Sequence, residues 1–250
     1  MSITQNVLLA KERIAAAAMA AGRDPGEIRL LAATKMNGPD AIREAIAAGV
    51  DICGENRVQE YISKAEVNAY GSCPVHFIGH LQKNKVKYLV GKVGLIHSVD
   101  SVALMEAVSR RAEALGQVQD ILLEVNIGGE AQKSGVAVED LPALLSAAGN
   151  YGGLRVKGLM AIPPAETVPG ENVRYFRRMH ELFVDNRRKK YDNVLMTELS
   201  MGMSEDYQEA VRWGATIVRL GTALFGPRNT MQEASGRGNI GRAEKADETL

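Results

Sequence analysis

Cysteine, aromatic residues and net charge are all scarce in this sequence. Its 250 residues include two cysteines, Cys53 and Cys73, which are too few for a disulfide framework and do not form a C-x-x-C pair. The 30 Lys and Arg residues balance the 30 Asp and Glu residues, so no net charge attracts nucleic acid or an anionic membrane. Aromatic residues, at 5%, do not interleave with the basic clusters as base stacking would require. We therefore expect a protein of the reducing cytoplasm, with a small molecule and no nucleic acid as its partner.

Familiar catalytic and metal-binding motifs are missing as well. The patterns H-E-x-x-H, G-x-S-x-G and G-x-x-x-x-G-K-[ST] do not occur. His76 and His80 are close in sequence, but the segment that joins them reads as a strand end and a turn, which does not bring both side chains onto one metal ion. The segment from Gly236 to Gly241 matches G-x-G-x-x-G, but it lacks the preceding strand and the following helix of a dinucleotide site. We expect neither a metal site nor a dinucleotide site.

Long apolar runs are absent, although apolar residues make up 46% of the chain. That share is ample for a sizeable core, and no run approaches the roughly 20 residues that cross a bilayer. The first segment, "VLLAKERIAAAAMAAG", suits an amphipathic helix that ends at Gly22 rather than a targeting signal. We expect a soluble protein without a membrane partner.

Short apolar runs alternate with helical patterns as far as Gly226. The eight runs predicted to form strands are Arg29–Thr34, Asp51–Gly54, His76–Gly79, Leu95–Val99, Ile121–Val125, Val156–Met160, Val194–Leu199 and Ile217–Leu220. The alternation favours parallel strands closed into a single (β/α)8 barrel of the TIM type, with the first segment as an additional N-terminal helix. A doubly wound open sheet gives much the same local pattern and is the alternative. Residues 1–226 would form this domain, and the polar residues 227–250 are predicted to be a disordered tail.

Lys35 follows the first predicted strand. Period-two alternation places Leu31, Ala33 and Lys35 on one face of that strand. If this face is the barrel interior, the ammonium group lies at the barrel mouth, where a partly desolvated lysine is a nucleophile toward aldehydes. Considered alone, Lys35 is more simply explained as a surface lysine at the start of a loop.

Two loops near the end of the predicted domain suit a phosphate group. The segments "LSMGMSED" and "RLGTALFG" combine hydroxyl groups with glycine where the chain leaves the last two strands. Glycine lets backbone N–H groups approach an anion closely, and phosphate-binding barrels use the loops at these two positions. Ser200, Gly202, Gly221 and Thr222 are the candidate phosphate residues. Each glycine motif by itself is equally explained as an ordinary turn.

Three more polar residues lie at predicted strand ends. Arg219 ends the last strand, where a buried guanidinium needs a partner, either a ligand or a carboxylate of a neighbouring strand. Asn56 lies just beyond the second strand and would either bond a ligand or cap the helix that follows. Lys133 lies in the loop after the fifth strand, at the same end of the barrel, and is alternatively a solvated loop lysine.

Eight motifs together resemble a known family. They are, in order, "AATKMN", "GENRVQE", "HFIGHLQKNK", "HSVDS", "KSG", "GLMAI", "LSMGMSEDYQEA" and "RLGTALFG". Their order and spacing are similar to those of the pyridoxal phosphate homeostasis protein family, which is related to the N-terminal barrel of alanine racemase. The resemblance covers nearly the whole chain to Gly226. Met36 and Asn37 stand where the family often has proline or a basic residue, a departure that concerns only the rim of the pocket.

The resemblance implies a cofactor, pyridoxal 5′-phosphate (PLP), held by Lys35 in a Schiff-base linkage. It implies that the phosphate is held by Ser200 and by the backbone around Gly221 and Thr222, and that Arg219 meets the pyridine nitrogen. It further implies that Asn56 and Met160 line the cofactor and that Lys133 helps in cofactor exchange.

The resemblance leaves two functions to weigh, a non-catalytic PLP carrier and a PLP-dependent amino-acid racemase of low activity. A two-base racemase needs a second acid or base opposite Lys35, and in alanine racemase this is a tyrosine from a C-terminal β-domain of the partner subunit. Here we expect only a polar tail after the barrel, and Arg219 should keep the ring nitrogen unprotonated. We therefore expect a protein that buffers PLP or delivers it to PLP-dependent apoenzymes. We also expect a monomer, because a closed barrel leaves no strand edge unpaired.

Overall fold

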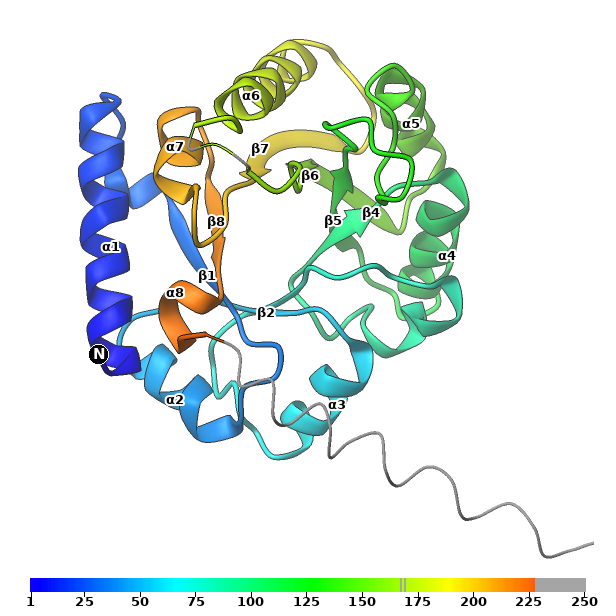
Figure 1. The fold of residues 1–250 in the computed structure, drawn as a ribbon. Helices are drawn as coiled ribbons and strands as arrows, with labels where there is room; N and C mark the ends of the chain where they lie inside the picture. The colour runs from blue at the N-terminus through cyan, green and yellow to red at the C-terminus, as the bar shows by residue number, and fades with distance from the viewer. Residues whose placement is uncertain (167, 169, 228–250) are drawn as a thin grey trace, which may run out of the picture.

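The strands close into a barrel in the order of the chain. The computed structural model of the protein describes residues 1–166, 168 and 170–227. All eight strands are parallel, and β1 is hydrogen-bonded to both β2 and β8 (Figure 1). The strands are β1 Arg29–Ala33, β2 Ile52–Glu55, β3 Val75–Phe77, β4 Leu95–Val99, β5 Gln119–Glu124, β6 Leu154–Met160, β7 Val194–Ser200 and β8 Ile217–Leu220. The predicted (β/α)8 barrel is confirmed, and the doubly wound alternative is wrong because an open sheet would leave its two outer strands unpaired.

Helices surround the barrel on the outside. They are α1 Ile3–Ala20, α2 Pro39–Ala47, α3 Val58–Glu66, α4 Val102–Glu113, α5 Leu141–Ala147, α6 Val173–Arg187, α7 Tyr207–Arg212 and α8 Thr222–Phe225. The additional N-terminal helix is confirmed as α1, which begins with a capping box between Ser2 and Gln5 and lies against α2, α7 and α8. Between β3 and β4 the chain forms a 3-10 helix, Lys83–Tyr88, in place of an α-helix.

Two separate clusters of apolar side chains form the core. Leu30 and Ala32 belong to the larger cluster, between the strands and the helices, whereas Leu31 and Ala33 belong to the smaller one inside the barrel. The inner cluster consists of Leu31, Ala33, Ile52, Ile78, Leu95, Leu122, Met160 and Ile217. The period-two prediction is therefore confirmed for Leu31 and Ala33. Because β1 ends at Ala33, Lys35 lies beyond the strand in a turn at the barrel mouth.

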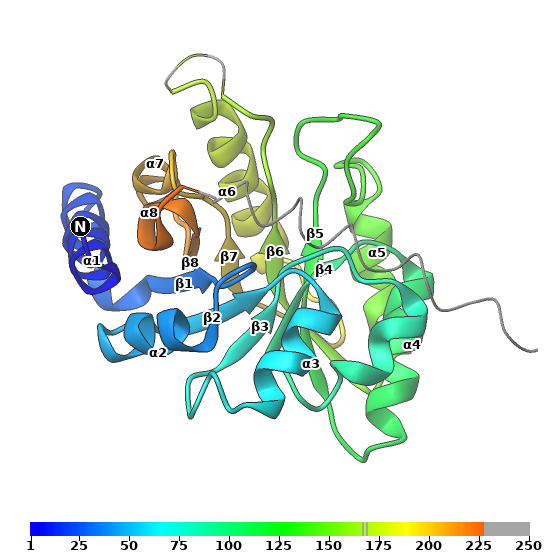
Figure 2. The same ribbon diagram turned by 60° about the horizontal axis from the view of Figure 1, so that its bottom comes forward.

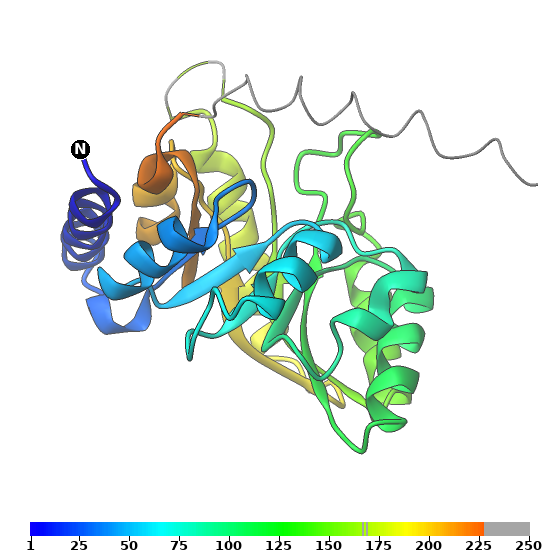
Figure 3. The same cartoon turned by 90° about the horizontal axis from the view of Figure 1, so that it is seen from below.

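The loops at the C-terminal ends of the strands surround this mouth. Figures 2 and 3 show the β5–α5 and β6–α6 loops extending on the same side, beyond the strand ends. Within the described residues, no helix is both long enough and apolar enough to cross a membrane. The predicted tail, residues 227–250, lies outside the described part of the chain except for Pro227.

Candidate functional site

A cavity of about 530 Å³ opens at the C-terminal ends of β1, β6, β7 and β8. Four of the candidate residues line it, namely Lys35, Arg219, Gly221 and Thr222. The pairing of β1 with β8 brings them together, because Leu31 lies beside Arg219 in the register of these strands. An amine, a guanidinium and a glycine-containing turn therefore converge on one space although they come from opposite ends of the sequence.

Ser204, a residue that the sequence did not single out, also lines this cavity. Its hydroxyl oxygen accepts hydrogen bonds from the backbone N–H of Gly221, at 3.2 Å, and of Ala223, at 3.1 Å. Two amide groups that converge on one oxygen provide the arrangement that a phosphate oxygen needs. The segment "LSMGMSED" already contained this residue, because its second serine is Ser204, which is closer in sequence to Gly221 than Ser200 is.

Ser200 occupies a different environment from the one expected of a phosphate residue. Its side chain is fully buried, and its hydroxyl accepts a hydrogen bond from Arg219 Nη1 at 2.7 Å. The second contact of this hydroxyl is His97 Nδ1, at 3.0 Å. Ser200 therefore positions Arg219, and Ser204 takes the place at the cavity that the sequence assigned to Ser200.

Gly202 and Met160 also lie away from the cavity lining. Gly202 has a φ of 91°, and a Cβ atom there would approach Ala210 Cβ to 2.5 Å, so the position requires glycine for the packing of α7. Its carbonyl oxygen accepts the backbone N–H of Arg219 at 3.0 Å. Met160 belongs to the inner cluster of the barrel and is 1% exposed. Both residues support the strands that carry the site.

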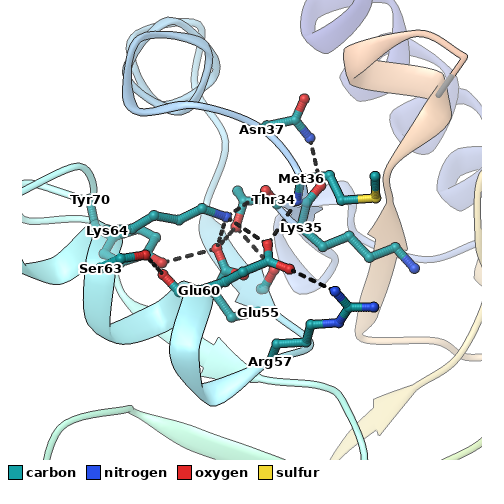
Figure 4. Close-up of polar contacts among 11 residues, drawn as sticks. Thr34, Lys35, Met36, Asn37, Glu55, Arg57, Glu60, Ser63, Lys64 and Tyr70 are labelled. Carbon is teal, nitrogen blue, oxygen red and sulfur yellow. Dashed lines mark hydrogen bonds and ion pairs between the residues drawn. The ribbon is translucent and has the colours of Figure 1, made fainter. Parts of the chain in front are cut away.

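The turn that carries Lys35 is held on both sides. Thr34 precedes Lys35, and its carbonyl oxygen accepts a hydrogen bond from Lys64 Nζ at 2.9 Å. Met36 follows Lys35 with a φ of 62°, a conformation that costs a non-glycine residue about 1–2 kcal/mol. Its backbone N–H donates to a Glu60 carboxylate oxygen at 2.8 Å. Figure 4 shows the Lys35 side chain directed away from the Lys64 and Glu60 side chains that hold the turn.

A cluster of buried polar side chains stabilises the turn that carries Lys35. Lys64 Nζ lies 2.8 Å from Glu55 Oε1, in an ion pair whose side chains are 9% and 0% exposed. The same carboxylate oxygen accepts hydrogen bonds from the hydroxyl groups of Tyr70 and Thr34 (Figure 4). Burial, and the charge of Glu55, raise the pKa of Tyr70, which therefore remains a donor. The cluster fixes Thr34, and so fixes the chain immediately before Lys35.

Arg219 is held by neutral oxygen atoms. Besides Ser200, its guanidinium donates to the carbonyl oxygen of Ala161 at 2.9 Å. Burial lowers the pKa of Arg219 to about 10, against the opposing charges of Glu124 and Asp206. The group therefore remains charged at neutral pH. The alternative was an ion pair with a carboxylate of a neighbouring strand, but the guanidinium donates to the Ser200 hydroxyl and the Ala161 carbonyl oxygen instead.

A chain of hydrogen bonds runs from Arg219 across the barrel interior to two histidines. The Ser200 hydroxyl, which accepts a hydrogen bond from Arg219, is paired with His97 Nδ1 at 3.0 Å. The other ring nitrogen of His97, Nε2, is paired with His76 Nδ1 at 3.0 Å. Both rings are neutral, because burial lowers the pKa of His97 well below its usual value and that of His76 to about 3. Among the described residues, no three His, Cys, Asp or Glu side chains gather at a metal-binding distance.

Asn56 and Lys133 lie near the mouth without lining the cavity. Asn56 does not cap α3, whose N-cap is Arg57 without a side-chain cap bond, and Asn56 Oδ1 is buried with no hydrogen-bond partner among the described residues. Lys133 Nζ lies 2.6 Å from Glu130 and donates to the carbonyl oxygen of Pro163 at 3.0 Å. Since the next residue, Pro164, lines the cavity, Lys133 connects the β5–α5 loop to the cavity wall.

These residues fit the cofactor that the sequence resemblance implies. Lys35 supplies an amine for an aldehyde, the amides of Gly221 and Ala223 suit phosphate oxygens, and Arg219 suits a ring nitrogen that accepts a hydrogen bond. Asn56 adds a buried oxygen at the end of β2 whose hydrogen-bonding capacity is unused in the described structure. An amine, a phosphate cradle and a cationic donor around one cavity match a phosphorylated pyridine aldehyde.

Comparisons with known proteins agree with this fit. Residues 11–229 match the model of the family described as alanine racemase, N-terminal domain. A pyridoxal phosphate homeostasis protein of Aquifex aeolicus is 46% identical over 217 residues, which cover 87% of this chain and 94% of the relative. Another, from Pseudomonas aeruginosa, is 41% identical over 234 residues, which cover 94% and 99%. The solved structure of PipY from Synechococcus elongatus with PLP bound is 37% identical, with a TM-score of 0.74, and the match covers 86% and 99% of the two chains.

The positive φ of Met36 predicts a stabilising substitution. Met36→Gly should raise the free energy of unfolding by about 1 kcal/mol relative to Met36→Ala, because only glycine adopts this conformation without strain. Chemical denaturation of both variants measures the difference, and Met36→Ala controls for the loss of the side chain. Equal stability of the two variants would contradict the strained turn.

The two buried histidines predict acid sensitivity. Their pKa values are lowered in the folded state, so the unfolded chain binds more protons and stability is lost as the pH falls from about 6.5 toward 3. Each contributes up to about 1.4 kcal/mol per pH unit to this slope. Denaturation of His97→Gln at several pH values should give a shallower slope than the wild type. An unchanged slope in His97→Gln would contradict the assignment.

Proposed function

The chain belongs to the pyridoxal phosphate homeostasis protein family, and we propose that it binds PLP through Lys35 and buffers or delivers the cofactor without turning over a substrate. The observation that carries the proposal is the convergence of Lys35, Arg219, Gly221 and Thr222 on one cavity. When bound, PLP supplies an aldehyde that lysine can capture and a pyridine ring that can delocalise carbanion charge.

Lys35 and the turn at Gly221 would bind opposite ends of PLP. The Lys35 amine would hold the cofactor aldehyde covalently, and the hydrogen bonds to Thr34 and Met36 keep the backbone of Lys35 in place. A phosphate oxygen would take the place of the Ser204 hydroxyl on the N–H groups of Gly221 and Ala223, and the hydroxyl groups of Ser204 and Thr222 would then donate to the phosphate. Binding through two distant ends of one ligand orients it across the cavity.

Arg219 limits the chemistry available at this site. A guanidinium donates hydrogen bonds and never accepts them, so a ring nitrogen held by Arg219 would stay unprotonated. An unprotonated ring withdraws electrons weakly, which makes carbanion formation at an amino acid slow. The hydrogen bonds to Ser200 and Ala161 keep Arg219 in this role.

The alternative is a PLP-dependent amino-acid racemase of low activity, which would need a second acid or base opposite Lys35. Within the described lining, the titratable residues besides Lys35 and Arg219 are Glu166, Glu205 and Asp206, and none is a tyrosine, histidine or cysteine. Asp206 accepts hydrogen bonds from the Asn172 amide and the Met203 N–H, which hold it in the loop structure. This arrangement supports a carrier over a racemase.

The carrier role extends to partners and location. We place the protein in the cytoplasm as a monomer whose recipients are PLP-dependent apoenzymes. Lys133, which bonds the loop beside the cavity wall, is the residue that we assign to cofactor exchange.

The Lys35 linkage is testable by absorption spectroscopy. Mixing the protein with PLP should give a Schiff-base band, and Lys35→Ala should abolish it. Lys87→Ala, which removes an exposed lysine away from the cavity, controls for PLP captured on the surface and should retain the band. Borohydride reduction followed by peptide mapping should locate the adduct on Lys35, and an adduct elsewhere would overturn the assignment.

The same loaded protein distinguishes the carrier from the racemase. Incubation with L-alanine should yield no more D-alanine than free PLP yields, as measured by chiral chromatography. Turnover at an ordinary enzymatic rate, on the order of 1–1000 s⁻¹, would establish the racemase in place of the carrier.

The two serines make opposite predictions about the phosphate. Ser204→Ala should weaken PLP binding about tenfold, the effect of one lost hydrogen bond to a charged group, and should leave the affinity for pyridoxal, which has no phosphate, unchanged. Ser200→Ala should change both affinities alike, because Ser200 acts through Arg219. Fluorescence titration with the two ligands measures this. A loss specific to PLP in Ser200→Ala, without one in Ser204→Ala, would restore Ser200 as the phosphate residue.

A further inference from the structure

The two cysteines of the chain lie side by side although 19 residues separate them in sequence. Cys53 is on β2 and Cys73 lies just before β3, and their sulfur atoms are 3.6 Å apart. The backbone N–H of Cys53 donates to the carbonyl oxygen of Pro74 at 2.9 Å, which fixes the two segments relative to each other. Neither cysteine lines the cofactor cavity. The pair is therefore a second feature of the barrel, separate from the proposed PLP site.

The two thiols differ in accessibility and in acidity. Cys53 is buried, whereas Cys73 is partly exposed and lies between the exposed residues Ser72 and Pro74. The hydrogen bond from the Cys53 thiol lowers the pKa of Cys73. That hydrogen bond, burial and the nearby charge of Glu55 raise the pKa of Cys53. Cys73 is thus the more acidic and the more accessible of the two thiols, and Cys53 is the buried thiol beside it.

We propose that Cys53 and Cys73 form a peroxide-sensitive thiol pair that closes to an intrachain disulfide and is reopened by a small dithiol. The Cys73 thiolate attacks hydrogen peroxide, forming an S–O bond and breaking the O–O bond, and hydroxide leaves and is protonated to water. Cys73 is then a sulfenic acid, oxidised by two electrons. The Cys53 sulfur attacks the Cys73 sulfur, the S–O bond breaks, and the oxygen leaves as water with the Cys53 proton.

The position of Cys73 makes closure geometrically feasible. A disulfide needs the sulfur atoms at about 2.05 Å, so the pair must close by a further distance of roughly 1.5 Å. Cys73 lies in the turn after α3 rather than in a strand, and its backbone N–H is bonded to the Tyr70 carbonyl oxygen at 3.0 Å. The movement therefore falls on a turn and leaves the β2–β3 pairing in place.

The test uses the full reduced chain, freed of reductant and treated with hydrogen peroxide. Intact mass should show the loss of two hydrogens per chain, and peptide mapping after alkylation under denaturing conditions should show Cys53 joined to Cys73. Dithiothreitol should reverse both changes. In Cys53→Ser, dimedone should trap a sulfenic acid at Cys73, whereas in Cys73→Ser the Cys53 thiol should react at least about tenfold more slowly than Cys73 does in the wild type.

Three outcomes would overturn the proposal: oxidation of the wild type without an intrachain link, disulfides between chains only, or equal reactivity of Cys53 in the Cys73→Ser variant. Circular dichroism of each variant establishes that it is folded. Should Cys53→Ser fail to fold, Cys53→Ala removes the same sulfur from an apolar environment and serves in its place. The result does not depend on PLP, so its failure would leave the proposed function untouched.

Discussion

Closure of the barrel between β1 and β8 is the constraint on which the site depends. The hydrogen-bonded register sets Leu31 beside Arg219 and Ala32 beside Leu220, so the segments that follow these strands leave the barrel as neighbours. An atom in the Cβ position of Gly221 would lie 3.7 Å from Ala33 Cβ. In an open sheet with β1 away from β8, the amine of Lys35 and the amides of the glycine turn would have no common cavity. The ability to hold one ligand at both ends is thus a consequence of topology.

Lys64 and Arg219 are both buried cations near the barrel mouth, but the protein stabilises them in different ways. The difference indicates which of them supports the fold and which is available to a ligand. Lys64 lies within 3.3 Å of the Glu55 and Glu60 carboxylates, which neutralise it within the protein. Arg219 donates to the neutral oxygens of Ser200 and Ala161, and burial lowers its pKa to about 10. A buried charge that is not neutralised internally is costly to the fold, but it lets the protein direct a cationic donor at a ligand. Lys64 therefore serves the structure, and Arg219 faces the cavity.

Much of the fold and part of the site could be predicted from the sequence, because both depend on local patterns. The alternation of short apolar runs with helical patterns located all eight strands, and period-two alternation placed Leu31 and Ala33 inside the barrel. Strand-end positions indicated Lys35 and Thr222, which line one cavity. The residues whose surroundings differ from those expected depend on contacts between distant segments. Gly202 resembles a phosphate-loop glycine, but it is required by the packing of α7, and local sequence does not distinguish the two requirements. Likewise, nothing in the sequence links His76 to His97, whose hydrogen bond depends on adjacent strands meeting in one register.

A carrier must hold its ligand firmly, and polar contacts hold both walls of the cavity. The wall formed by β1 and β8 ends in short connections, where Lys64 and Glu60 fix the chain on both sides of Lys35. The facing wall includes Pro164 and Glu166 of the β6–α6 loop, and Lys133 of the β5–α5 loop donates to the carbonyl oxygen of Pro163 beside them. The same loop begins at Ala161, whose carbonyl oxygen accepts a hydrogen bond from Arg219. The proposed carrier would therefore hold its ligand at strand ends that buried polar contacts fix, next to a loop wall that is itself bonded to the cationic donor.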